Sequence, residues 1–322
     1  MPLLEIDDLS VTFGPRNDPT TVVDGVAFSV DPGQTAALVG ESGSGKSVTA
    51  LAIMRLLQEP GRVTRGAIRF QGRDLARLGE SEMAAVRGDR IAMIFQEPMS
   101  SLNPLMSIGA HVAEPLRLHR RLSRRAARAK AIALFDRVSI PSAAKRYDDY
   151  PHRMSGGMRQ RVMIAAALAC EPALLIADEP TTALDVTIQA QIMDLLSDLQ
   201  AEFGMGILFI THDLGIVAEQ AHRVVVMYAG RIVERADTVT LFRGAAHPYS
   251  AALLNGIPDD GAGERLAVIE GSVPAPTALP PGCRFAPRCP RAAAACRSAD
   301  PPLAALGADH AVACIHPLEA AA

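Results

Sequence analysis

The sequence lacks any apolar run that approaches the roughly 18 residues of a membrane-spanning helix. Its first residues, Met1 to Glu5, have neither a basic start nor a long apolar core, so no secretory signal is recognised. Cysteine is also scarce, with only 5 in 322 residues. These absences predict a cytosolic protein. In that reducing compartment, cysteines are expected to bind metal or to pack in the interior rather than to form disulfides.

A strong net charge is absent as well. The formal net charge is -3 at pH 7, which gives no reason to expect nucleic acid as the main partner. One basic cluster lies between residues 110 and 150, where the sequence looks helical. No aromatic residues are interleaved with it, so a solvated helical face is favoured over a nucleic-acid or membrane patch. The cluster consists of Arg117, His119, Arg120, Arg121, Arg124, Arg125, Arg128 and Lys130.

Among the features that are present, the most informative is the pattern G-x-x-x-x-G-K-S at residues 40–47. An apolar run at 34–39 predicts a strand before it, and 48–57 has helical spacing after it. A glycine loop between a strand and a helix is the setting in which this pattern binds phosphate. We expect Lys46 to reach the β- and γ-phosphates and the Ser47 hydroxyl to hold Mg²⁺. The predicted phosphate-binding residues are Gly40, Ser42, Gly43, Ser44, Gly45, Lys46 and Ser47.

The segment before this loop predicts an antiparallel start to the fold, with strands at 3–13 and 26–30. Residues 67–74 resemble a hairpin at the edge of a sheet. Phe13 ends the first of these strands. Its ring can stack on a nucleotide base or serve as a half-buried strand aromatic, and both readings stay open.

Polar side chains follow three apolar strands further along the chain. Ligands bind at the carboxyl ends of strands in α/β sheets, so each of these side chains is a candidate site residue. Gln96 follows the first strand. Asp178 and Glu179 end the second, where the first carboxylate fits a Mg²⁺ partner and the second can orient an attacking water. His212 follows the third, where a contact to phosphate is favoured over a structural role.

A second candidate anion site is formed by Ser155, Gly156 and Gly157, which begin a predicted helix through residue 168. This triplet is weak evidence by itself and gains weight from the motifs around it. An amphipathic helix is predicted at 186–203, and a final hairpin at 223–234.

Composition changes near residue 255, and proline and glycine become frequent, which predicts an appended small domain. Four cysteines fall in this segment: Cys283, Cys289, Cys296 and Cys314. Their spacing is wider than structural zinc prefers, while the proline after Cys289 is typical of some iron–sulfur ligand runs. Iron–sulfur, zinc and free thiols therefore remain open. His310 and His316 flank the last cysteine and are expected to be structural, and Cys170 is expected to pack in the interior.

Together these motifs resemble the ATP-binding subunit of an ABC transporter over residues 3–250. In the family's order they are Walker A at 40–47, the Q-loop Gln96, the signature at 154–158, Walker B at 174–178 followed by Glu179, the D-loop at 183–185, and the switch residue His212. The resemblance implies an α/β P-loop NTPase cassette: a RecA-like core, an antiparallel β subdomain and a helical subdomain at about 97–165. The cassette would span 1–255 and a C-terminal extension 256–322.

Finer features resemble the dipeptide/oligopeptide importer branch of the family. They are residues 96–104, 155–161, 247–250 and 281–290. Met154 and Met158 depart from the general L-S-G-G-Q signature, and the second departure is usual in this branch. Some members of the branch carry a [4Fe–4S] cluster in the extension, which implies Cys283, Cys289, Cys296 and Cys314 as its ligands.

The resemblance implies an ATPase in which Glu179, His212 and Gln96 are catalytic. The implied Mg²⁺ ligands are Ser47, Gln96 and Asp178. The implied nucleotide-binding residues are Phe13, the P-loop residues, Gln96, Asp178, and Ser155, Gly156 and Gly157, the last three serving the ATP of a second subunit.

The implied partners are a paralogous ATPase subunit, two transmembrane permease subunits and, indirectly, an extracytoplasmic substrate-binding protein, with no nucleic acid. The chain would lie peripherally on the cytoplasmic face of the inner membrane. Three alternatives stay open: import of nickel or another small solute, a soluble ABC ATPase, and a regulatory subunit that does not turn over, against which Glu179 speaks.

Overall fold

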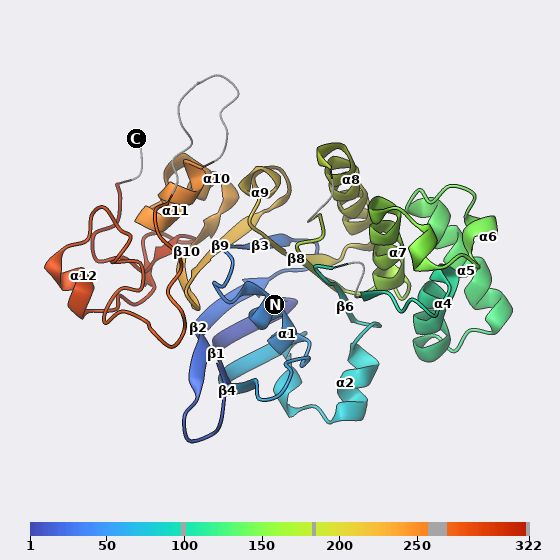
Figure 1. Cartoon of the computed structure of the whole chain (residues 1–322), viewed down its shortest axis with the longest axis horizontal. Helices are drawn as coiled ribbons and strands as arrows, with labels where there is room; N and C mark the ends of the chain where they lie inside the picture. Colours follow the sequence, from blue (N-terminus) through green and yellow to red (C-terminus); the bar gives the residue numbers. More distant parts are fainter. Residues whose placement is uncertain (98–100, 182–184, 257–268, 320–322) are drawn as a thin grey trace. The chain divides into compact units, whose positions relative to one another are not determined.

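The computed structural model describes residues 1–97, 101–181, 185–256 and 269–319. Its residues divide into two compact units, which Figure 1 colours along the chain. The first unit comprises Met1–Val30, Thr35–Ala76 and Phe209–Ala322, and the second comprises Asp31–Gln34 and Arg77–Leu208. In the described part of the chain, no helix is both long and apolar enough to cross a membrane.

The first unit contains a four-stranded antiparallel sheet in the order β2-β1-β4-β5. Its strands are β1 (Leu4–Phe13), β2 (Thr20–Val30), β4 (Arg62–Phe70) and β5 (Arg73–Asp74). Leu4 of β1 pairs with Val30 on one side and with Phe70 on the other, so β1 is central. The predicted antiparallel start and edge hairpin are therefore confirmed, although β2 begins six residues before the predicted residue 26.

A second set of strands in the first unit carries the phosphate-loop motif. β3 (Thr35–Val39) is buried along its whole length and pairs in parallel with β9 (Arg223–Tyr228). β9 is antiparallel to β10 (Arg231–Asp237), which confirms the predicted final hairpin. β10 pairs in turn with β12 (Ala311–Val312), and β12 with β11 (Ala304–Ala305). Residues from the cysteine-containing segment thus extend the same sheet.

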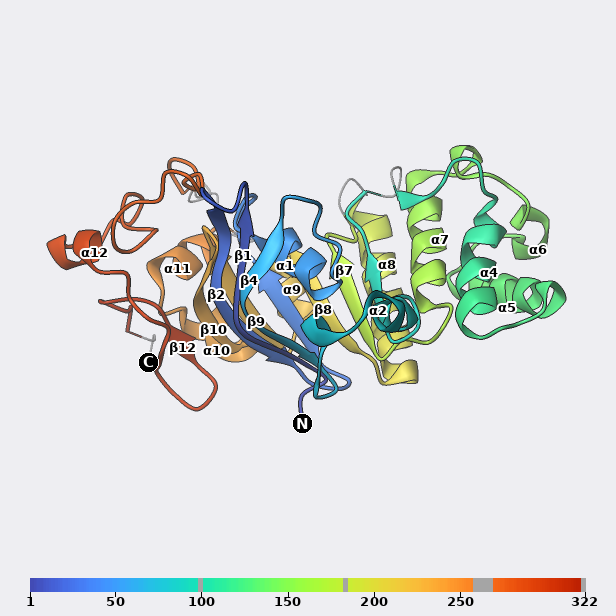
Figure 2. The same ribbon diagram turned by 90° about the horizontal axis from the view of Figure 1, so that it is seen from below.

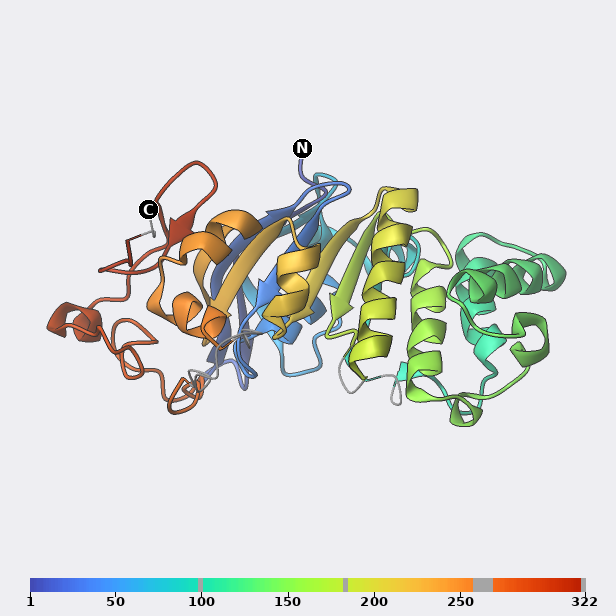
Figure 3. The same ribbon diagram turned by 90° about the horizontal axis from the view of Figure 1, so that it is seen from above.

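Helices flank these strands. α10 (Thr238–Gly244) and α11 (Pro248–Leu254) pack on β10, as Figure 3 shows. α1 (Lys46–Ile53) contacts β1, β2 and β4. The predicted helix at 48–57 ends early, because Arg55 has a left-handed φ of 51° that no α-helix continues through. The other helices of this unit are α9 (Leu214–Gln220) and α12 (Ala294–Ser298).

The second unit combines two parallel strands with a group of helices. β6 (Ile91–Ile94) pairs with β7 (Leu174–Asp178). α4 (Ile108–His119), α5 (Arg124–Arg137) and α7 (Gly156–Leu168) pack on one another, as Figure 2 shows. The other elements described in this unit are α2 (Glu80–Val86), α6 (Ala143–Arg146), α8 (Val186–Phe203) and a 3-10 turn at Pro151–Arg153, while a 3-10 turn at Leu75–Arg77 spans the boundary between the two units in the sequence. β8 (Gly206–Thr211) begins in this unit and ends in the first.

Carboxylates pair with several members of the basic cluster between residues 110 and 150. Arg128 forms two hydrogen bonds with Asp148, at 3.1 and 3.0 Å, and Lys130 contacts Glu171 at 2.9 Å. All four side chains are largely exposed. These contacts fit the predicted solvated helical face.

Candidate functional site

The glycine loop of residues 40–47 connects β3 to α1. Gly40, Gly43 and Gly45 have φ values of 151°, 80° and 103°, a region of backbone space that favours glycine. A Cβ atom at position 40 would lie 2.1 Å from the carbonyl oxygen of Met227. The curl of this loop therefore requires glycine, as the predicted phosphate-binding motif does.

The Lys46 side chain is buried within this loop. Its ammonium donates to the carbonyl oxygen of Gly40 at 2.7 Å and to that of Glu41 at 3.0 Å. α1 begins at Lys46, and the N–H groups in the first turn of a helix carry partial positive charge. A buried cation beside a helix N-terminus favours an anion such as phosphate. Ser47 follows in the first turn of α1.

Two residues from the C-terminal part of the chain hold Glu41, the second residue of the loop. The Tyr249 hydroxyl accepts a hydrogen bond from the Glu41 N–H at 2.9 Å. The Arg288 guanidinium contacts both oxygens of the Glu41 carboxylate, at 2.7 and 3.0 Å. No local sequence pattern predicts these contacts, which span 208 and 247 positions. The one available signal is that each residue falls in a segment typical of the importer branch.

In the second unit, the structure brings Gln96 and Glu179 together. Each follows one of two paired parallel strands, β6 and β7, whose register matches Ile94 with Ala177. Gln96 Nε2 donates to Glu179 Oε2 at 3.0 Å. Glu179 has a left-handed φ of 46°, a strained backbone for a glutamate. Asp178, the last residue of β7, is buried.

Ser155 is the N-cap of α7, and Gly156 and Gly157 form its first turn. The Ser155 hydroxyl accepts from the Met158 N–H at 3.3 Å. A Cβ at position 157 would lie 3.0 Å from Cγ2 of Ile188 in α8, so close helix packing also favours glycine there. The predicted helix start, a polar cap followed by two glycines, is confirmed, and anion binding there stays a prediction.

Two other predicted site residues lie in the first unit. His212 follows β8 and is exposed, and the next residue, Asp213, caps α9. Phe13 ends β1 and is half-buried, with its ring against Gly61: a Cβ at position 61 would lie 2.6 Å from Phe13 Cε1. Of the D-loop, residues 183 and 184 lie outside the described residues, as do residues 98–100 of the segment after Gln96.

The four late cysteines converge on one cavity of about 20 Å³. Burial raises the pKa of the Cys283 and Cys314 thiols, which favours their neutral form. Cys283 N–H donates to the carbonyl of Cys296 at 2.9 Å, which ties two of the cysteine loops together. Among the residues that the structure describes, no three His, Cys, Asp or Glu side chains form a group that could hold a metal ion.

His310 and Cys170 have surroundings that fit the structural roles predicted for them, while the role of His316 stays a prediction. His310 Nε2 lies 2.8 Å from Oε1 of the fully buried Glu234, which gives it a structural role. His316 lines the cysteine cavity. Cys170 is buried, and burial raises the pKa of its thiol, as expected of a packing residue.

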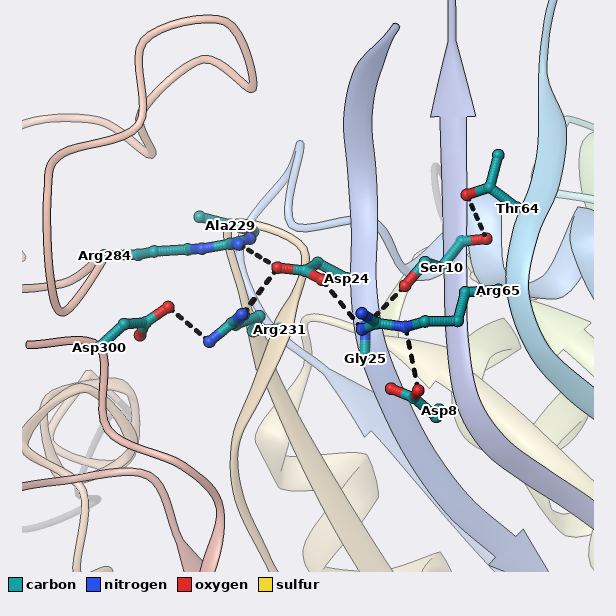
Figure 4. A network of polar contacts seen from close by, with 10 residues as sticks. All are labelled: Asp8, Ser10, Asp24, Gly25, Thr64, Arg65, Ala229, Arg231, Arg284 and Asp300. Carbon is teal, nitrogen blue, oxygen red and sulfur yellow. Dashed lines mark hydrogen bonds and ion pairs between the residues drawn. The ribbon is translucent and has the colours of Figure 1, made fainter.

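A second arginine of the extension, Arg284, pairs with Asp24 of β2 (Figure 4). Arg284 contacts the Asp24 carboxylate at 2.6 Å, and Arg231 of β10 contacts the same carboxylate at 2.8 Å. Burial raises the pKa of Asp24, but hydrogen bonds and charges from these two arginines outweigh it, so the net shift is downward. Arg231 also pairs with Asp300 of the extension.

Aromatic packing continues this attachment. The Phe285 ring lies edge-on to Tyr228 of β9, with centroids 5.2 Å apart, and 5.3 Å from the ring of Tyr249. All three rings are buried. The extension is therefore part of the hydrophobic core of the first unit.

Comparison with known proteins agrees with this geometry. The ABC transporter family matches residues 23–182, and the C-terminal region of oligopeptide/dipeptide transporters matches residues 233–296. A putative peptide import ATP-binding protein of Brucella melitensis is 53% identical over 100% of this chain and 99% of its own length. The oligopeptide transport ATP-binding protein AppD of Bacillus subtilis is 51% identical over 94% of this chain and 92% of its own.

Solved structures show the same fold. The dimeric ATP-binding cassette MJ0796, in a post-hydrolysis state bound to ADP and Pi, has a TM-score of 0.66 at 26% identity, covering 73% of this chain and 98% of its own. The cbiO1 protein of Clostridium perfringens has a TM-score of 0.64 at 27% identity, covering 75% and 90%. The chain belongs to the ATP-hydrolysing ABC transporter family, in the branch defined by the oligopeptide/dipeptide transporter C-terminal region.

Proposed function

We propose that this chain is the motor subunit of an ABC importer of dipeptides or oligopeptides, in which ATP binding and hydrolysis drive uptake across the cytoplasmic membrane. The observation that carries the proposal is the curled glycine loop with the buried Lys46 ammonium inside it. Peptides as the substrate class are supported by the C-terminal region and by the names of the relatives.

Each of the predicted site residues has a separate role in this proposal. Lys46 and the loop N–H groups bind the β- and γ-phosphates. Ser47, Gln96 and Asp178 offer the oxygen ligands that Mg²⁺ prefers, and the ion would neutralise phosphate charge. Glu179 orients the attacking water, with Gln96 fixing its carboxylate through the 3.0 Å hydrogen bond. His212 contacts the γ-phosphate, and Phe13 stacks on the base.

We also propose that the chain works with a second ATPase subunit. Ser155, Gly156 and Gly157 would then serve that partner's ATP. The proposal is supported by the single P-loop in this sequence and by the dimeric form of the cassette MJ0796. Two permease subunits and an extracytoplasmic substrate-binding protein would complete the importer, with this chain peripheral on the cytoplasmic face of the membrane.

Co-expression with two candidate permeases and the partner ATPase, followed by detergent extraction, tests this assembly. We expect the four subunits to purify together and ATP turnover to rise when peptide-loaded binding protein is added. An active chain that never associates with membrane subunits would favour a soluble ABC ATPase. Stimulation by a nickel-loaded binding protein alone would favour the small-solute alternative.

For the extension, we propose that Cys283, Cys289, Cys296 and Cys314 ligate a [4Fe–4S] cluster with a structural role. The observation in favour is that all four line one cavity. Four thiolates are the donor set of such clusters, and the cluster would cross-link the loops of the extension. The cavity of about 20 Å³ is close to the size of one water, so binding requires the cysteine loops to move apart.

Anaerobic purification of the full chain tests the cluster directly. We expect a brown protein with broad absorbance near 400 nm, about four irons per chain, and loss of the colour when Cys289 is replaced by Ser. The matched control is Cys170→Ser, which should keep the colour. Colourless anaerobic protein with one zinc would assign the site to zinc, and absence of any metal would leave the cysteines as packing residues.

A further inference from the structure

The guanidinium of Arg288 is locked in place beside the phosphate loop. Besides its two contacts to Glu41, it donates to the carbonyl oxygens of Ile269, Glu270 and Gly271, at 3.1, 2.9 and 3.4 Å. It also donates to the Tyr228 hydroxyl at 3.3 Å. The side chain is only 6% exposed. These partners hold the Arg288 guanidinium in one geometry against the Glu41 carboxylate.

Each polar group of Glu41 has a partner, and two of these partners come from the C-terminal part of the chain. Its carboxylate faces Arg288, its N–H donates to Tyr249, and its carbonyl oxygen accepts from Lys46 at 3.0 Å. The residue that helps hold the loop lysine is thus itself held by the C-terminal region. A change at Arg288 would reach Lys46 through a single intervening residue.

The charge of Glu41 makes this contact functionally important. A carboxylate in the second position of a loop that binds a triphosphate repels the ligand, because like charges destabilise each other. The bidentate pair with Arg288 neutralises that carboxylate and fixes it, which Lys could do only as a point charge. Without Arg288, the loop would hold an unpaired anion beside the phosphates.

We propose that Arg288 is a positioning residue for ATP binding, which acts through Glu41 by neutralising its carboxylate and fixing the second residue of the phosphate loop. This inference rests on the proposed function, in which the loop binds ATP. It assigns the C-terminal extension a direct part in the affinity for nucleotide, in addition to its place in the core of the first unit.

Anchoring of the extension does not depend on this contact. Arg284, four residues before Arg288, makes its own half-buried ion pair with Asp24 on β2, a different carboxylate from that of Glu41 (Figure 4). Phe285 supplies the aromatic packing between the two arginines. Arg284 is therefore a matched control, since each arginine lies next to a cysteine and pairs with one carboxylate of the first unit.

The inference is tested by measuring the equilibrium binding of MgATP to the full-length purified chain by calorimetry. Arg288→Ala should weaken binding about tenfold, which corresponds to ~1.4 kcal/mol. Arg288→Lys should fall between wild type and Arg288→Ala, and Glu41→Gln alone should stay within about twofold. Adding Glu41→Gln to Arg288→Ala should restore affinity to within about threefold of wild type. Arg284→Ala should lower the melting temperature and leave affinity unchanged.

If Glu41→Gln restores the MgATP affinity of Arg288→Ala, then Arg288 acts through the charge of Glu41. A purely structural role of Arg288 predicts that the double variant binds as weakly as Arg288→Ala. Wild-type affinity in Arg288→Ala, or a double variant as weak as Arg288→Ala, would overturn it. If Arg288→Ala does not fold, Arg288→Lys decides the matter, and unchanged affinity in that variant counts against the inference. Failure of the wild-type chain itself to bind MgATP would instead refute the proposed function.

Discussion

Gln96 Nε2 lies 3.0 Å from Glu179 Oε2, although the two residues are 83 positions apart in the chain. Each follows one of two paired parallel strands, β6 and β7, so both residues lie at the carboxyl edge of the same pair of strands. The amide holds the carboxylate that we assign to the hydrolytic water. The proposed chemistry thus depends on an arrangement set by the register of two strands.

Replacing Glu179 by Gln should abolish turnover and retain binding. The amide keeps the shape of the side chain and loses the base, so hydrolysis in the assembled complex should fall by at least about 10²-fold. Phosphate release and MgATP binding, measured on the same preparation, check this. Gln96→Ala leaves the carboxylate in place without its hydrogen bond and should cost less, about tenfold. Near-normal turnover of Glu179→Gln in a complex whose partner site is also disabled would exclude this role.

Lys46→Ala should weaken MgATP binding, because it removes the buried cation that we propose to bind the phosphates. Ser47→Ala removes the Mg²⁺ ligand that we propose and should weaken binding of MgATP more than binding of ATP with EDTA present. Calorimetry under both conditions measures the difference. Unchanged affinity and unchanged hydrolysis in both variants would show that the loop at 40–47 is not the nucleotide site.

Ser155→Ala should separate binding from turnover. Since Ser155 is proposed to serve the partner's ATP, the isolated variant should bind MgATP as wild type does, while turnover in the complex falls. Loss of the cap of α7 should cost about 1 kcal/mol of stability, which a thermal melt reports. Full hydrolytic activity of the isolated chain at low concentration, independent of a partner, would contradict the two-subunit arrangement.

Asp24→Asn should destabilise the first unit by about 2 kcal/mol at neutral pH, within the range for hydrogen bonds to charged groups. The pKa of Asp24 is lowered in the folded protein, so its stabilising contribution is present above the unfolded value of 3.8 and is lost as pH falls through the folded value. The difference in unfolding free energy between wild type and variant should therefore be constant from pH 5 to 7 and shrink below pH 4. Denaturant melts across this range provide the measurement.

Local patterns in the sequence predicted most of the helices and strands that the structure describes, and the roles of the site residues stay predictions. Alternating apolar residues marked β1, and the glycines at 40, 43 and 45 marked a loop whose backbone only glycine adopts. The predicted length of α1 was wrong, because an arginine at position 55 gives no indication that its backbone is left-handed. β12 has only two residues, which is too short for the alternation of apolar and polar residues that marks a strand.

Contacts between distant segments could not be predicted in the same way. Nothing in the neighbourhood of Arg288 indicates that it meets Glu41, since the pairing depends on how the extension folds back over β9 and α11. The convergence of four cysteines on one cavity is likewise a tertiary feature, which their wide spacing did not require. The domain boundaries at residues 255 and 256 and the helical subdomain at 97–165 stay predictions.

Peptide import by this chain is tested most directly by uptake of a labelled dipeptide into proteoliposomes that contain the chain, its partner ATPase and both permeases, with the binding protein outside and MgATP inside. We expect accumulation that requires ATP and is lost when Glu179→Gln replaces the wild-type chain. Equal accumulation by the Glu179→Gln assembly, or ATP hydrolysis that never moves peptide, would contradict it.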